Sequence, residues 1–264
     1  MRTTPIVLML LGVALHNPVA AQQIETGFLD RSVVLAGTEY RYQVFIPRNY
    51  QESQAWPVVL ALHGGGSYGS DGITPTVRGI ANVLRRYPDR YPAIVVFPQS
   101  PAGGDGWQEF GGRVALAALD GTLAEFHTDS QRVYLTGLSA GGNGSWYLSY
   151  NHPERFAAVI VVCGFVEDFV GTTSGTVYAA IAPASSSDAF ATIAERISGI
   201  PIWIFHGDAD PVVSVEQSRR MTAALRAVGA DVQYTEFPGV GHNAWDPAYA
   251  LDELPAWLFA QRKR

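Results

Sequence analysis

Residues 137–141 read Gly-Leu-Ser-Ala-Gly and place a serine hydroxyl between two glycines. The apolar run Val133–Thr136 precedes this motif and a helical pattern follows it, so Ser139 is predicted to lie in a sharp turn between a strand and a helix. The glycines keep side chains out of this crowded turn. The turn holds the hydroxyl at the helix N-terminus, where backbone N–H groups and the helix dipole favour a developing negative charge. Ser139 is therefore the candidate nucleophile.

A serine hydroxyl is a weak nucleophile at neutral pH and needs a neighbouring base. The six candidates are the histidines at positions 16, 63, 127, 152, 206 and 242. His242 lies in the loop of residues 239–245, after the last predicted strand, which places it at the same sheet edge as Ser139. We therefore expect His242 to be the general base. His206 ends an apolar strand, and His63 is expected to brace a glycine-rich loop.

A carboxylate must hold the base in its productive tautomer and stabilise its protonated form. Residues 206–211 read His-Gly-Asp-Ala-Asp-Pro and offer two carboxylates after a predicted strand. Asp210 precedes a proline and is therefore held extended, which suits an orienting residue. Asp208 is the alternative, although an aspartate there is more suited to binding the amides of a turn. The order Ser139, Asp210, His242 is the order of the α/β-hydrolases.

The negative charge that develops on a substrate carbonyl needs backbone donors. One is expected to be the Ala140 amide. The second is expected from the loop His63–Gly66, in which Gly65 is favoured by position and its two neighbouring glycines are close competitors. Trp107 and Trp245 are candidates for the substrate pocket, and the alternative for both is hydrophobic packing beneath the loops.

The elements that must position these residues alternate between short apolar runs and helical patterns. Strands are predicted at residues 41–46, 58–62, 94–97, 133–136, 158–162, 202–205 and 232–237, and helices at residues 75–86, 112–127, 141–151, 214–229 and 247–262. A further helix at residues 187–197 belongs to one of two interpretations of residues 164–199. The last six of these strands are dominated by Val, Ile, Leu, Ala and aromatic residues, and near-continuous apolar strands fit a parallel sheet covered on both faces. The sequence therefore predicts a doubly wound, mostly parallel α/β sheet. Ser32–Leu35 and Tyr40–Ile46 are predicted to form an antiparallel hairpin at its edge, and residues 22–264 to form a single domain.

Residues 164–199 interrupt the alternation of strands and helices with a long stretch rich in Gly, Ala, Ser and Thr. Ordinary connections between a strand and a helix are much shorter. The stretch is either an exposed loop with one helix or a small lid insertion over the carboxyl ends of the strands. Cys163, the only cysteine, precedes it at the end of an apolar run. A single thiol forms no internal disulfide, and we expect Cys163 to pack as a small hydrophobic residue.

Residues 1–21 have the pattern of a secretory signal peptide. Arg2 precedes an apolar run that is too short to span a membrane, and small residues at positions 19 and 21 predict cleavage after Ala21. We therefore expect a secreted or periplasmic protein with no membrane segment after cleavage. The formal net charge of −6 implies no nucleic-acid partner. No cysteine pair, His-x-x-x-His or dinucleotide-binding glycine motif occurs, so neither a metal nor a cofactor is expected.

Five motifs follow one another in a familiar order: residues 62–72 (Leu-His-Gly-Gly-Gly to Gly-Ser-Asp-Gly), 97–107 (Phe-Pro-Gln-Ser-Pro to Trp), 136–146, 206–213 and 241–245. The set resembles secreted bacterial esterases of the α/β-hydrolase superfamily, in the phospholipase/carboxylesterase-like group also labelled predicted peptidases. It is also similar to polyhydroxybutyrate depolymerase-like and feruloyl esterases. The resemblance runs from about residue 40 to residue 257, and residues 164–199 depart from it.

The resemblance implies hydrolysis of carboxylic esters, either small molecules or polymers, with Ser139, Asp210 and His242 as the catalytic triad. It also implies that Trp107 lies near the acyl pocket. Two alternatives are a serine peptidase that uses the same triad and a non-catalytic binding protein of the same fold. The intact triad and the glycines around Ser139 disfavour the binding protein, because such proteins usually lose one of these residues.

Overall fold

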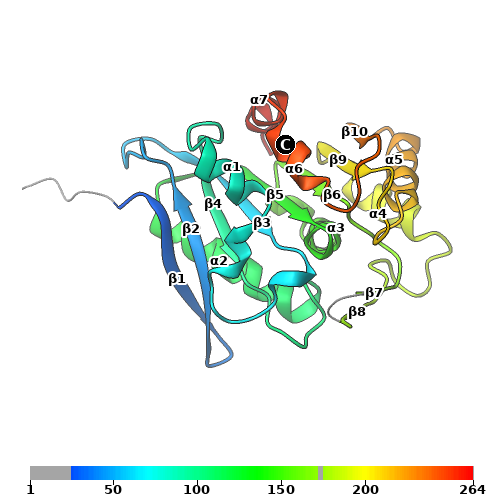
Figure 1. The fold of residues 1–264 in the computed structure, drawn as a ribbon, viewed down its shortest axis with the longest axis horizontal. Coiled ribbons are helices and arrows are strands. Elements are labelled where there is room, and N and C mark those ends of the chain that lie inside the picture. The colour runs from blue at the N-terminus through cyan, green and yellow to red at the C-terminus, as the bar shows by residue number, and fades with distance from the viewer. Residues whose placement is uncertain (1–24, 172–174, 264) are drawn as a thin grey trace, which may run out of the picture.

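The computed structural model describes residues 25–171 and 175–263 (Figure 1). The predicted signal peptide, residues 1–21, lies outside the described residues. Within these ranges no helix is both long enough and apolar enough to cross a membrane.

One eight-stranded sheet runs through the molecule in the order β1-β2-β4-β3-β5-β6-β9-β10. The strands are β1 (Gly27–Leu35), β2 (Thr38–Ile46), β3 (Trp56–Leu62), β4 (Ile94–Pro98), β5 (Thr128–Leu138), β6 (Ala158–Val162), β9 (Ile202–Gly207) and β10 (Val232–Phe237). From β4 to β10 all neighbours pair in parallel, whereas β2 is antiparallel to both β1 and β4. The predicted mostly parallel sheet with an N-terminal antiparallel hairpin is confirmed.

Burial along the strands explains this arrangement. Every residue of β3, β4, β6 and β9 is buried, as expected for parallel strands covered on both faces. Strand β1 at the edge instead alternates between half-buried and exposed positions over residues 29–35. The β1–β2 turn uses Ala36 and Gly37, both at positive φ, which matches the right-handed twist of a tight hairpin.

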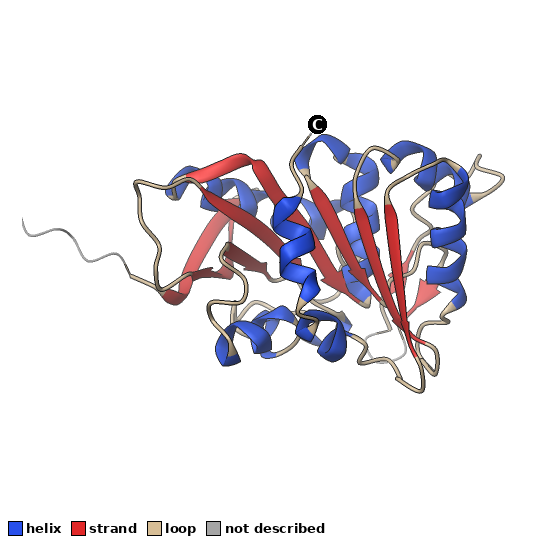
Figure 2. Cartoon of the chain, turned by 90° about the horizontal axis from the view of Figure 1, so that it is seen from above, coloured by secondary structure: helices blue, strands red, loops and turns tan. Residues whose placement is uncertain are grey.

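Helices cover both faces of the sheet (Figure 2). One apolar core holds residues of α2 (Glu109–Glu125), α3 (Ala140–Asn151), α4 (Ala189–Ile197) and α5 (Glu216–Ala227). A second core on the other face holds residues of α1 (Ile80–Arg86), α6 (Trp245–Ala250) and α7 (Glu253–Ala260). The doubly wound architecture follows from these two cores.

Two of the predicted helices are each divided into two shorter elements. The prediction of one helix over residues 75–86 is wrong, because Arg78 is extended and Gly79 has a φ of +66°, which separates the 3₁₀ turn η2 (Thr74–Val77) from α1. The helix predicted over residues 247–262 is similarly interrupted at Leu251, whose ψ of 130° ends α6 before α7 begins.

Residues 164–199 contain a short hairpin and a helix. Strands β7 (Phe169–Val170) and β8 (Val177–Tyr178) pair antiparallel, and Asp188 caps α4 by accepting hydrogen bonds from two of its amides. The hydroxyl groups of Tyr178 and Tyr68 are hydrogen-bonded, which ties β8 to the loop after β3. The helix predicted over residues 187–197 is present, and a lid role for the segment stays a prediction.

Candidate active site

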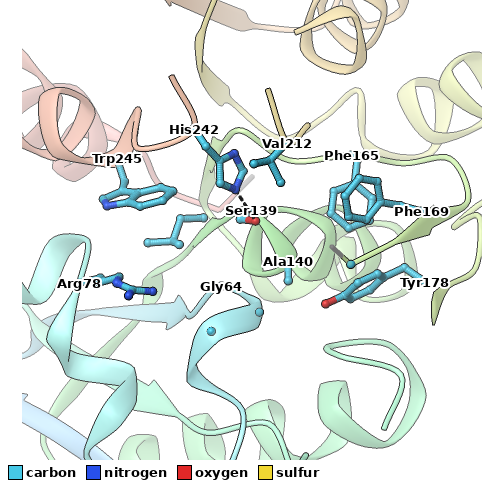
Figure 3. A pocket seen from close by; sticks show the side chains of 14 residues that line it. Gly64, Arg78, Ser139, Ala140, Phe165, Phe169, Tyr178, Val212, His242 and Trp245 are labelled. Carbon is cyan, nitrogen blue, oxygen red and sulfur yellow. Dashed lines mark hydrogen bonds between the residues drawn. The ribbon is translucent and has the colours of Figure 1, made fainter. Parts of the chain in front are cut away.

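The carboxyl ends of four parallel strands bring the predicted site residues to one edge of the sheet. The loop His63–Gly66 follows β3, Ser139 follows β5, Asp210 follows β9 and His242 follows β10. Ligands of open α/β sheets bind outside these ends. Figure 3 shows Ser139 and His242 facing each other at the centre of a pocket.

The turn at Ser139 has the strained backbone expected for an exposed nucleophile. Ser139 has a φ of 55° and a ψ of −117° and directly precedes α3. A Cβ on Gly137 would lie 2.0 Å from the carbonyl oxygen of Gly141, and a Cβ on Gly141 would lie 2.1 Å from that of Leu62. Real Cβ atoms do not approach so closely, so both flanking glycines are required by the packing of the turn.

A continuous chain of hydrogen bonds joins Ser139, His242 and Asp210. The Ser139 Oγ lies 2.9 Å from Nε2 of His242, and Nδ1 of His242 lies 2.7 Å from Oδ2 of Asp210. Because the carboxylate can only accept, Nδ1 carries the proton and Nε2 is free to accept one from the serine. The Asp210 side chain is fully buried, whereas that of His242 is 20% exposed toward the pocket.

The Asp210 carboxylate has other hydrogen-bond partners besides His242. Its Oδ1 accepts hydrogen bonds from the amides of Val212 and Val213 at 2.8 and 3.0 Å, and its Oδ2 lies 3.2 Å from Nε2 of the buried His206. Burial alone would raise the pKa of Asp210, but the hydrogen bonds from His206, His242 and the two amides hold it well below its usual range. Asp210 is therefore ionised at neutral pH. Nothing in the sequence indicates that His206 contacts this carboxylate.

Asp208 has a different role from Asp210. Its Oδ1 accepts a hydrogen bond of 2.6 Å from the amide of Gly239, in the loop that carries His242. A Cβ on Gly207 would lie 2.1 Å from the carbonyl oxygen of Val240, so the two loops pack backbone to backbone. Asp208 therefore fixes the histidine loop through a turn amide, as its position in the sequence suggested.

The predicted donors of the oxyanion hole also line the pocket. Gly65 and Ala140 line the same pocket as Ser139, and in the described parts of the chain neither amide has a hydrogen-bond acceptor. Gly64 and Gly66 line the same pocket, so the choice of Gly65 stays a prediction. Nδ1 of His63 donates to the carbonyl oxygen of Gly64 at 2.8 Å and braces this loop.

His63 is a neutral imidazole of defined tautomer. Its Nε2 accepts a hydrogen bond of 3.0 Å from the Ser100 amide, which leaves the proton on Nδ1. Burial lowers the pKa of His63 to about 4, so the ring is uncharged at neutral pH. This ring supports the loop but does not line the main pocket.

The two tryptophans proposed for the pocket occupy different places. Trp245 lines the pocket, with its ring edge-on to that of His242 at 5.5 Å. Trp107 is fully buried, does not line the pocket, and donates its indole N–H to the carbonyl oxygen of His63 at 2.9 Å. The prediction that Trp107 contacts substrate is therefore wrong, because its ring packs beneath the loop His63–Gly66 and against Gly144.

The pocket has a volume of about 440 Å³, which suits a small-molecule group. Phe165, Phe169 and Tyr178, all from residues 164–199, lie on one side of Ser139, whereas Arg78 and Trp245 lie on the other side (Figure 3). The three aromatic residues and Arg78 were missed from the sequence. Aromatic residues in a segment rich in small residues give no periodic signal, and Arg78 was assigned to a continuous helix.

Cys163 lies directly beside Asp210 and His242. It is fully buried at a φ of +42°, and its thiol donates to the carbonyl oxygen of His242 at an S···O distance of 3.4 Å. Burial raises the pKa of the Cys163 thiol well above its usual range, and Asp210 adds to this effect. Cys163, Asp210 and His242 place possible metal-ligand atoms within 4.8 Å of one another. Their hydrogen bonds already satisfy these groups without an ion.

Comparison with known proteins agrees with this fold. The fold is that of the α/β-hydrolases: the solved structure of a thermostable esterase superposes with a TM-score of 0.74 at 30% sequence identity, covering 89% of this chain and 63% of that one. Residues 114–260, more than half of the chain, match the prolyl oligopeptidase family. The chain therefore belongs to the prolyl oligopeptidase family.

Two relatives are similar to this chain over half or less of their own length. An uncharacterized secreted protein of Arthroderma benhamiae is 26% identical over 222 residues, which are 74% of this chain and 22% of that protein. Feruloyl esterase B of Neurospora crassa is 27% identical over 157 residues, which are 53% of this chain and 49% of that protein. The chain thus spans about half or less of the length of these two relatives.

Proposed function

We propose that the protein is an exported serine hydrolase that cleaves carboxylic esters, with Ser139 as nucleophile, His242 as general base and Asp210 as the orienting acid. The observation that carries this proposal is the chain of 2.9 and 2.7 Å hydrogen bonds from Ser139 through His242 to Asp210, which opens into the pocket. The similarity to proteins named as esterases supports esters as the substrate class.

Acylation begins when Oγ of Ser139 attacks the ester carbonyl carbon while Nε2 of His242 takes the hydroxyl proton. The carbonyl oxygen becomes an oxyanion, which the amides of Ala140 and Gly65 stabilise. The bond to the leaving oxygen then breaks, and the imidazolium of His242 donates its proton to that oxygen. The products of this half-reaction are the free alcohol and an ester of Ser139.

Deacylation repeats the same steps with water. His242 accepts a proton as the water oxygen attacks the acyl carbon, and it returns a proton to Oγ of Ser139 as the acid leaves. In both halves the ionised Asp210 stabilises the imidazolium and keeps its Nδ1–H directed inward. The low pKa of Asp210 fits this task, because the carboxylate stays charged throughout the cycle.

The test is labelling and kinetics of Ser139→Ala beside Ser130→Ala, a serine on the exposed surface. A fluorophosphonate probe should label the wild type and Ser130→Ala but not Ser139→Ala. Hydrolysis of p-nitrophenyl acetate by Ser139→Ala should fall by roughly 10³-fold or more, with unchanged circular dichroism. Retention of a tenth of the activity would contradict the assignment.

A peptidase is the second candidate, because the matched family takes its name from peptidases. The same triad cleaves esters more readily, since an alkoxide or phenolate leaves more easily than an amine. Parallel assays on p-nitrophenyl acetate and a p-nitroanilide peptide separate the two activities, and we expect the ester to be the better substrate by kcat/KM. Export is tested by N-terminal sequencing of the protein recovered outside the cytoplasm, which should begin near Gln22.

A further inference from the structure

Arg78 brings a permanent charge to the pocket. Of the fourteen described residues that line the pocket, Arg78 is the only arginine or lysine, and none is an aspartate or a glutamate. The nearby Asp210 is fully buried behind His242 and is already paired. The pocket therefore has a positive group, although the whole chain has a net charge of −6.

The Arg78 guanidinium is not used to hold the fold together. Within the described residues, the recorded hydrogen bonds, ion pairs and cation–π contacts do not include it, and its side chain is exposed. Arg85, on the helix that follows, serves as a comparison. Its guanidinium donates to the carbonyl and hydroxyl oxygens of Thr76 and lies 4.4 Å from the ring centre of Phe28. Arg85 therefore has structural partners, whereas Arg78 has none among the described residues.

The backbone around Arg78 is firmly fixed and is close to the nucleophile. Thr76 is fully buried and its hydroxyl donates to the carbonyl oxygen of Ile73, which stabilises the turn η2. Gly79 follows at a φ of +66°, and a Cβ there would lie 2.7 Å from the side chain of Leu138. Because Leu138 directly precedes Ser139, the base of the Arg78 side chain is positioned relative to the reacting centre.

The guanidinium itself reaches the glycine-rich loop. Its Nη1 lies 3.0 Å from the place that a Cβ of Gly66 would occupy, one residue beyond the predicted donor Gly65. Figure 3 shows it directed into the pocket from the side of Trp245, whereas Phe165 and Tyr178 lie across Ser139 from it. The pocket thus has Arg78 beside Trp245 on one side of the nucleophile and an aromatic wall, formed by Phe165, Phe169 and Tyr178, on the opposite side.

We propose that Arg78 forms a carboxylate subsite, so that the preferred substrates are esters that carry a carboxylate on the side of the reacting bond opposite to the aromatic wall. Guanidinium groups bind carboxylates through paired, charge-assisted hydrogen bonds. An unpaired guanidinium beside a glycine loop can present several N–H donors to such a group, and the exposed amides of that loop are free of side chains. This inference deepens the proposed ester hydrolysis and rests on it.

The carboxylate can belong to either half of the ester, and two pairs of probes separate these sources. For the alcohol half the pair is 4-acetoxybenzoate and its methyl ester. For the acyl half it is mono-4-nitrophenyl adipate and 4-nitrophenyl hexanoate. In each pair the ratio of kcat/KM for the charged ester to that for the neutral ester measures charge recognition.

The variant is Arg78→Gln, and the matched control is Arg86→Gln. Arg86 is also exposed and has no recorded ion pair within the described residues, but it does not line this pocket. Arg78→Gln should lower the charged-to-neutral ratio about tenfold in one pair, mainly through KM, as expected for the loss of a charge-assisted hydrogen bond. The ratio should also fall as salt is raised in the wild type but not in Arg78→Gln. Arg86→Gln should keep the wild-type ratio.

Two results would overturn the carboxylate subsite. One is an unchanged ratio in both pairs. The other is an equal loss on charged and neutral esters, which would assign Arg78 to general support of the loop or of the oxyanion. If the wild type cleaves none of the four esters, the proposed hydrolysis fails instead. The subsite is then judged by calorimetric binding of 4-acetoxybenzoate to Ser139→Ala with and without Arg78→Gln, where equal affinity overturns it.

Discussion

The substitution Asp210→Asn tests the catalytic assignment most directly, because the structure fixes how the new amide must sit. The amides of Val212 and Val213 both donate to Oδ1, so the asparagine carbonyl oxygen must occupy that position. Its NH₂ group then replaces Oδ2 and faces Nδ1 of His242 at the 2.7 Å contact. To avoid two opposing donors, His242 must move its proton to Nε2, and it can then no longer accept the proton of Ser139.

The expected loss is on the order of 10⁴-fold in kcat at neutral pH, as for the corresponding change in other triads. This corresponds to about 5 kcal/mol of transition-state stabilisation. Asp208→Asn is the matched control, since its carbonyl oxygen can still accept from the Gly239 amide. Its activity should fall by less than about tenfold, because at most one hydrogen bond worth about 1 kcal/mol is weakened.

The assay is hydrolysis of p-nitrophenyl acetate by the two variants, with thermal unfolding as the control for folding. The folded pKa of Asp210 lies below its unfolded value, so the ionised group stabilises the fold above about pH 4, and this contribution is lost as the pH falls further. The difference in stability between the wild type and Asp210→Asn should therefore shrink below about pH 4. A larger activity loss in Asp208→Asn, or a tenth of the activity retained by Asp210→Asn, would refute the reasoning.

Three further predictions follow from the surroundings of the site. The pKa of His63 is lowered to about 4, so as the pH falls His63 takes up a proton in the unfolded chain before it does so in the folded protein. The free energy of unfolding should therefore fall by about 3 kcal/mol between about pH 6.5 and pH 4. His63→Gln should flatten this part of the stability profile, and an unchanged slope would contradict the prediction. Phe169→Ala should lower kcat/KM several-fold for feruloyl esters and less for acetyl esters, because its ring packs on Phe165 in the aromatic wall; equal responses would count against that wall. Gly141→Ala should cost about 3 kcal/mol or more in the free energy of unfolding, since its Cβ meets a backbone oxygen, whereas Gly199→Ala, which meets nothing within 4 Å, should be nearly neutral.

The proximity of Ser139, Asp210 and His242 could be predicted from the sequence because each of them has a local signal. Ser139 and Asp210 each follow an apolar strand at a turn, His242 follows the last strand, and parallel strands bring such turns to one edge. The sheet was predictable for a related reason: strands buried on both faces are apolar throughout, and the structure has them within a few residues of the predicted bounds. Strand β5 is longer than predicted: the sequence pattern predicts a start at Val133, whereas the strand begins at Thr128.

The missed residues depend on contacts that no local pattern encodes. His206 reaches Oδ2 of Asp210 only because the turn between them folds back on the strand end. Trp107 is buried because Gly144, on a different helix, leaves room for its ring. Arg78 enters the pocket because Gly79 breaks a helical pattern that otherwise continues. Each case was decided by tertiary packing, which overrides the preference of a short segment.

The position of Cys163 allows its thiol to report when the loop that carries His242 opens. It is the only cysteine, it is fully buried in the structure, and its thiol is hydrogen-bonded to the carbonyl oxygen of His242. A thiol reagent can therefore react only when the histidine loop lifts away from β6 or the whole chain unfolds. When reclosing is fast, the rate of labelling divided by that of a free thiol gives the equilibrium constant for opening. Without any engineered label, the same residue thus reports how often His242, the proposed base, leaves its place, and whether a bound ester holds it there.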